Sequence, residues 1–169
     1  MCIRDSNLHI TAGQFNASKD RIIWGTTQDV LNTSFNNVRV RGLVYDTNAQ
    51  KTVLFYSYSN VSPISYGAGA RVISVTNGDT ISLGADTTYY GPTASDYITS
   101  SEAVYDISAQ SILVYYGTNG NDSYARTMSI SGTTITFNTA TTLTTNGYPW
   151  RTDTVGYRYY SCSCSITNW

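Results

Sequence analysis

Six aromatic side chains fall in or near segments that we expect to connect strands, and they are the first residues whose type suggests binding chemistry. A flat ring beside Asn, Asp and Thr side chains suits a sugar, because a sugar offers an apolar face and a polar rim. The alternative is packing: there are 15 tyrosines in the chain, and a tyrosine ring can cover a sheet edge while its hydroxyl stays in water. Both interpretations stay open for Tyr66, Tyr89, Tyr90, Tyr97, Tyr148 and Trp150.

A Tyr-Asp pair occurs twice, as Tyr45-Asp46 and Tyr105-Asp106, and is the second candidate. A carboxylate at the end of a strand has the chemistry to ligate calcium or to accept a hydrogen bond from a sugar hydroxyl. The alternative is that each Asp accepts hydrogen bonds from nearby backbone N–H groups and so caps a turn. Because the pair recurs with the surrounding repeat, we expect the turn-capping role.

Histidine and cysteine do not form a metal-ligating pattern. The chain has one histidine, His9, and three cysteines, Cys2, Cys162 and Cys164. Cys162 and Cys164 are two residues apart on one expected strand face, which is poor geometry for a disulfide. His9 is far from both in sequence, so we expect no metal site and no cofactor.

The acidic residues give little support for catalysis. Ser-His-Asp chemistry would need His9, which lies in a partial first unit of the repeat. Glycoside hydrolysis needs two carboxylates that face each other across the scissile bond, and Glu102 with Asp106 or Asp96 is the conceivable pair. Nothing distinguishes these acids from surface residues, so the sequence predicts a protein that is not an enzyme.

All these residues are set in an internal repeat. The segment from Val44 to Gln50 reads VYDTNAQ and returns from Val104 to Gln110 as VYDISAQ. Ala70-Arg71 returns as Ala125-Arg126, and the offset shrinks from 60 residues in the first pair to 55 in the second. A copied unit whose loops were later shortened has this pattern. The period predicts an all-β array in which each unit buries a face against the next.

The composition also predicts strands and turns. Charged residues make up 12% of the chain, and strong helix formers with charged ends are scarce. Thr and Tyr suit a pleated, half-buried surface, while Asn and Gly suit tight turns. We therefore expect an all-β fold of antiparallel four-stranded units with essentially no helix.

Two-residue alternation divides each unit into four strands. Ile73 and Val75 share one face around Ser74, and an Asn77-Gly78 turn leads to the next strand. The expected strands are 42–46, 52–58, 70–76 and 80–83 in one unit, 103–106, 111–117, 125–131 and 134–137 in the next, and 8–17 and 21–31 in the partial first unit, with loops at 60–69 and 118–123.

Five segments follow from this alignment. The opening Met1–Ser6 resembles a translated sequencing-adapter remnant, so a tail over 1–7 is set apart from the fold. The remaining segments are a half unit over 8–37, whole units over 38–95 and 96–150, and the degenerate start of a further unit over 151–169.

Charge and hydropathy exclude two kinds of partner. The formal net charge is −1 and no stretch is basic, so nucleic acid is not expected. No apolar run is long enough to span a bilayer.

The unit as a whole resembles β-propeller blade repeats in tail-fibre and other surface proteins of phages and bacteria. The Tyr-Asp pair, the apolar strand after it, the Ala-Arg strand and the ending GTTITF at Gly132–Phe137 carry the resemblance, which covers residues 8–157 or so. Other propeller signatures differ: no Trp-Asp dipeptide closes a unit, and the turn at 129–135 lacks the Asp of a sialidase-type box.

The resemblance implies a partial β-propeller or an open arc from a longer array, on a virion or an extracellular or cell surface. Its expected role is display or recognition, in which blade loops contact a glycan or a host-surface receptor and neighbouring blades of the longer protein pack alongside. Two alternatives stay open: a purely structural spacer in a fibre, and a fragment of a propeller enzyme that acts on glycosides.

Overall fold

The computed structural model describes residues 8–31, 35, 37–61 and 63–145 of the chain. This part contains fourteen β-strands and no helix, so the expected all-β fold is confirmed. None of its elements is a helix long and apolar enough to cross a membrane. The strands are β1 (His9–Ile10), β2 (Gly13–Phe15), β3 (Ile22–Trp24), β4 (Gln28–Asp29), β5 (Asn37–Asp46), β6 (Lys51–Val61), β7 (Ile64–Thr76), β8 (Thr80–Leu83), β9 (Thr87–Thr93), β10 (Ile98–Asp106), β11 (Ser111–Thr118), β12 (Ser123–Ser131), β13 (Thr134–Phe137) and β14 (Thr141–Thr144).

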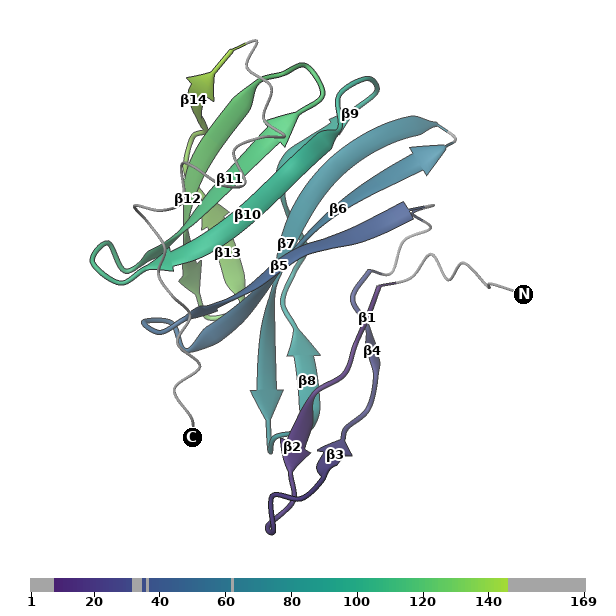
Figure 1. Ribbon diagram of the computed structural model, residues 1–169, viewed down its shortest axis with the longest axis vertical. Coiled ribbons are helices and arrows are strands. Elements are labelled where there is room, and N and C mark those ends of the chain that lie inside the picture. Colours follow the sequence, from purple (N-terminus) through teal and green to yellow (C-terminus); the bar gives the residue numbers. More distant parts are fainter. Residues whose placement is uncertain (1–7, 32–34, 36, 62, 146–169) are drawn as a thin grey trace.

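Two larger sheets share one strand order (Figure 1). The central sheet contains β5–β9, the outer sheet contains β10–β14, and all their strand pairs are antiparallel. In each sheet three strands form a meander, and two short strands then pair with the two ends of the third strand. The short strands are β8 and β9 on β7, and β13 and β14 on β12. The repeat in the sequence thus corresponds to a repeat in topology.

The N-terminal strands pair in the way that the third strand of a larger sheet pairs with its two short strands. β2 pairs with β3 and β1 pairs with β4, so the expected strands over 8–17 and 21–31 are each split in two. One backbone hydrogen bond recurs where the fourth strand of each unit breaks. It joins Gly25 N to Ala12 O at 2.8 Å, Gly84 N to Val72 O at 2.8 Å, and Asn138 N to Thr127 O at 2.9 Å.

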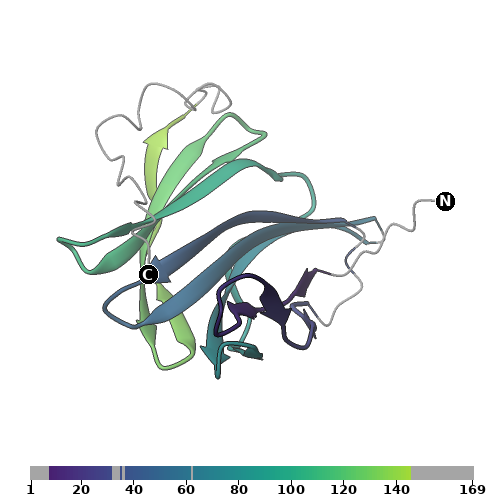
Figure 2. The same ribbon diagram turned by 60° about the horizontal axis from the view of Figure 1, so that its bottom comes forward.

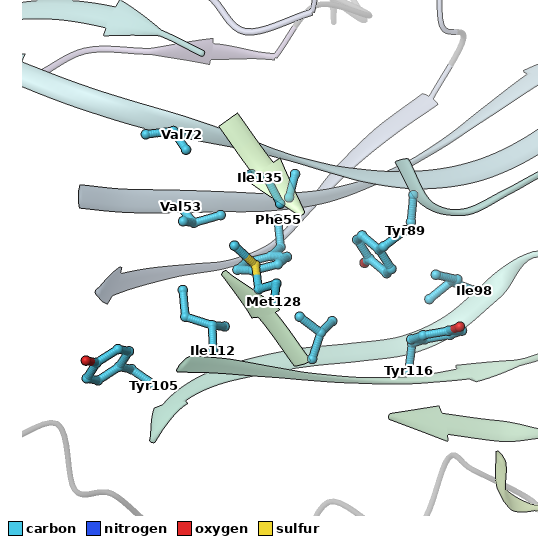
Figure 3. Packing of buried hydrophobic residues seen from close by; sticks show 13 residues of the cluster. Val53, Phe55, Val72, Tyr89, Ile98, Tyr105, Ile112, Tyr116, Met128 and Ile135 are labelled. Atoms are coloured by element: carbon cyan, nitrogen blue, oxygen red, sulfur yellow. The ribbon is translucent and has the colours of Figure 1, made fainter. Parts of the chain in front are cut away.

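The central sheet lies between the N-terminal strands and the outer sheet (Figure 2). Figure 3 shows its contact with the outer sheet, where Val53, Phe55 and Val72 belong to one buried cluster with Ile112 and Met128. All five side chains are almost fully buried. Burial of apolar surface contributes about 25 cal/mol per Å², so this seam between the sheets is a major source of stability.

The same face of each sheet turns toward the part of the chain that precedes it. Leu54 and Tyr56 of the central sheet pack with Val30 of the N-terminal segment. Their counterparts 60 residues later, Val114 and Tyr116, pack on the central sheet. Successive sheets are therefore added in one orientation, and the described sheets form no closed ring or barrel.

The observed strands agree with the expected fourth strands but differ from the expectation at residues 60–69 and at β9. The expected fourth strands are confirmed as β8 and β13. The expected loop over 60–69 is wrong, because β6 and β7 continue into a tight hairpin in which Asn60 pairs with Ser65. In sequence the segment resembles a loop because it contains glycine. In the structure Gly67 lies under a tyrosine ring, and a Cβ there would lie 2.5 Å from Tyr58 Cζ. β9 was not expected either, since its Gly91-Pro92 pair is typical of a turn.

Candidate functional site

A hollow of about 420 Å³ opens at the seam between the central and outer sheets. Its walls come from β5, β6 and β7 of the central sheet and from the first residues of β10 together with Tyr97 just before it. Arg39, Arg41, Tyr66 and Tyr97 contribute the largest side chains, and Ser57 is among the small ones.

Strand register explains why these side chains meet. Arg39 of β5 is opposite Ser57 of β6, while Ser59 of β6 is opposite Tyr66 of β7. Side chains directly opposite each other in antiparallel strands share a face, and residues two apart on a strand share it too. This face also carries Phe55, which packs on the outer sheet. The hollow is thus the polar continuation of the apolar seam.

Arg41 joins the two walls of the hollow. It lies where the pairing of β5 with β6 shifts register between Val40 and Gly42. Its Nε donates to Ser57 Oγ at 2.8 Å, and its Nη2 donates to the backbone oxygen of Ile98 at 3.0 Å. Burial lowers the pKa of Arg41, the interaction with Tyr89 counters this in part, and the nearby Arg39 charge lowers the pKa again. A guanidinium nevertheless stays protonated in proteins.

Arg39 is exposed at the opening of the same hollow. In the part of the chain that the structure describes, its guanidinium has no hydrogen bond or ion pair. None of the described residues that line the hollow carries a carboxylate. Two positive charges therefore lie together without a negative counterpart in the described lining.

Tyr66 of β7 and Tyr97, which directly precedes β10, lie ring to ring. Their centroids are 5.5 Å apart and their planes are inclined by 48°. The Tyr97 backbone is held by Asn119, whose Oδ1 accepts from Tyr97 N at 2.9 Å and whose N–H donates to Tyr97 O at 3.1 Å. Tyr97 is still 46% exposed, so a ring face is available at the rim.

The other predicted aromatic residues lie elsewhere. Tyr89 is 2% exposed in the core, and its hydroxyl is 2.9 Å from Ser101 Oγ. Burial raises the pKa of Tyr89 to about 12, and the bond to Ser101 counters this in part. Tyr90 is half-buried, with its ring 5.7 Å from that of Tyr116. Tyr148 and Trp150 lie outside the described residues.

The repeated Tyr-Asp pair has the turn-capping geometry. Asp46 Oδ1 accepts from the N–H groups of Asn48 and Ala49, both at 2.9 Å. Asp106 Oδ1 does the same for the N–H groups of Ser108, at 2.8 Å, and Ala109, at 3.1 Å. The side-chain hydrogen bond from Ser108 is the main cause that lowers the pKa of Asp106. Within the described residues no three His, Cys, Asp or Glu side chains lie close enough to hold a metal ion.

Sequence reasoning missed the two arginines of the hollow. A signal existed: the positions 60 residues after Arg39 and Arg41 are Thr99 and Ser101, so the arginines belong to one unit only. Function in repeat proteins gathers where units differ. The same criterion that selects the unrepeated aromatic residues therefore also selects Arg39 and Arg41.

Comparisons with known proteins give no match: no family model, no curated protein and no solved structure is similar to this chain. The resemblance to tail-fibre blades therefore stays a prediction from the sequence.

Proposed function

We propose that this chain is part of a propeller-like blade array in a virion or cell-surface protein and that it recognises glycan at the seam between its two larger sheets. The observation that carries the proposal is the Tyr66–Tyr97 pair at the rim of the hollow, in which Tyr66 comes from the central sheet and Tyr97 directly precedes the outer sheet. Aromatic faces stack on the apolar face of a sugar, and the serine and threonine hydroxyls of the hollow suit its polar rim.

The blade interpretation is supported by the order and stacking of the sheets. Each larger sheet is an antiparallel meander, and each turns the same face toward the preceding part of the chain. Leu43 and Tyr45 on that face of β5 are 57% and 53% exposed, because the described part of the preceding unit has only its third and fourth strands. The first two strands of a complete neighbouring blade would cover them.

Recognition fits the hollow better than catalysis does. Its described lining has no carboxylate, histidine or cysteine to act as general base or nucleophile. Asp106, an acid considered for glycoside hydrolysis, accepts the hydrogen bonds of its own turn. A binding module needs only rings, hydroxyls and fixed charges, and these are present.

A glycan array probed with the wild-type chain and with Tyr97→Ala tests the proposal. We expect the wild type to bind a subset of glycans and Tyr97→Ala to lose them with an unchanged melting temperature. Tyr45→Ala is the matched control, because Tyr45 is similarly exposed but points from the opposite face of the central sheet. An array on which the wild type binds nothing would overturn the proposal in favour of a structural spacer.

A further inference from the structure

The two arginines of the hollow carry a more specific inference about the ligand. Arg39 and Arg41 lie two residues apart on β5, and both line the hollow. Arg41 is close enough to the Arg39 charge for it to lower the pKa of Arg41. Like charges placed together cost free energy unless an anion is shared between them, and the described lining of the hollow provides no carboxylate.

The two guanidinium groups differ in how they are held. Arg41 donates to Ser57 Oγ and to the backbone oxygens of Ile98 and Thr99, so its position is fixed by the two sheets. Arg39 has no such partner, so within the described residues nothing occupies its planar guanidinium group. A guanidinium fork matches the two oxygens of a carboxylate, which makes this pairing stronger than a hydrogen bond between neutral groups.

We infer that the hollow binds an acidic glycan, with the sugar carboxylate held by Arg39 beside the fixed charge of Arg41 and the sugar ring placed against Tyr97. This inference rests on the proposed glycan recognition and names its ligand class. The next unit of the repeat does not carry this arginine pair, since the residues 60 positions further along the chain are Thr99 and Ser101. One such hollow is therefore built into the described chain.

The test is a binding titration with a panel of acidic glycans, each paired with its neutral methyl ester. Glucuronate, galacturonate and sialic acid oligosaccharides are the probes, measured by calorimetry with wild type, Arg39→Gln and Arg21→Gln. Arg21 is exposed next to β3, and Arg21→Gln removes the same charge as Arg39→Gln, which makes it the matched control. Thermal melting of all three proteins checks that they fold.

We expect the wild type to bind at least one acidic glycan about tenfold or more tightly than its methyl ester, because a guanidinium pairs more strongly with a charged carboxylate than with a neutral ester. Arg39→Gln should abolish this preference and Arg21→Gln should keep it. Equal binding of acid and ester would overturn the inference and leave glycan recognition standing. Absence of binding to every acid and every ester would also overturn the inference, whereas glycan recognition itself is overturned only by an array on which the wild type binds nothing. An equal loss in Arg39→Gln and Arg21→Gln would also overturn the inference, by assigning the preference to net charge.

Discussion

Arg126 Nη1 donates a hydrogen bond to the backbone oxygen of Tyr89 at 2.6 Å, which ties the third strand of the outer sheet to the last strand of the central sheet. The Nε of Arg126 donates to Asn138 O at 2.8 Å, where the fourth strand of its own sheet breaks. Arg71 makes the equivalent pair of bonds, to Gly84 O and to Val30 O. The repeated Ala-Arg dipeptide is therefore a clamp between successive units.

Replacement of Arg126 by Ala should destabilise the fold by about 2–3 kcal/mol, because two backbone carbonyls lose a charged donor. Arg126→Lys should restore only part of this, since a lysine cannot span both carbonyls as the planar fork does. Urea unfolding measures the free energies, with Arg21→Ala as the control, expected to stay within about 0.5 kcal/mol of wild type. An Arg126→Ala protein as stable as that control would contradict the clamp.

Tyr89 and Tyr97 should respond in opposite ways to alanine substitution. Tyr89→Ala removes a core ring and should cost about 3–5 kcal/mol of unfolding free energy, as for other large core residues. Tyr97→Ala removes a half-exposed ring and should change stability by less than about 1 kcal/mol. Chemical denaturation measures both. A stable Tyr89→Ala protein would show that its ring does not help to hold the sheets together.

The carboxyl group of Asp106 should titrate below the ordinary value of 3.8. Its pKa is lowered in the folded state, so the stability it adds is present above the unfolded pKa and is lost as pH falls through the folded pKa. Ser108→Ala removes the main cause of the shift and should raise the pKa toward 3.8. Carbon-detected NMR titration measures it, with Ser129→Ala as the control. An unchanged pKa in Ser108→Ala would refute this assignment.

Gly67→Ala should destabilise the chain, because the new Cβ would lie 2.5 Å from Tyr58 Cζ and the ring must move. Overpacking of this kind costs about 1–3 kcal/mol. Gly42→Ala is the matched strand control, since nothing lies within 4 Å of its Cβ position. Melting temperatures compare the two, and equal values would mean that the Tyr58 ring has room to shift.

Much of the secondary structure could be predicted from alternation and repetition. β8 and β13 agree with the expected strands to the residue. Each has alternating apolar and polar residues next to a turn that contains Gly, and this pattern determines both the strand and its start. The hairpin after Asn60 could not be predicted, since Gly67 belongs to a strand only when the Tyr58 ring covers it. That cover is a contact across strands, which local composition does not encode.

The site was predictable only in part. Tyr66 and Tyr97 are 31 residues apart in sequence, and only the packing of two sheets brings their rings together. Tyr89 and Tyr90 are adjacent to each other and equally plausible by composition, yet one fills the core and the other is half-buried. The pairing of β7 with β9 shifts register on both sides of the Ala68–Tyr90 pair. Such bulges change the direction of side chains, and the sequence carries no pattern that predicts them.

The central claim is that glycan is recognised at the seam between the two larger sheets. The most direct test is an NMR titration of the isotope-labelled chain with the strongest glycan from the array. The account predicts that chemical shift changes centre on Arg39, Ser57, Tyr66, Tyr97 and Thr99, around the hollow. Changes centred on another surface, or no changes with any glycan, would contradict it.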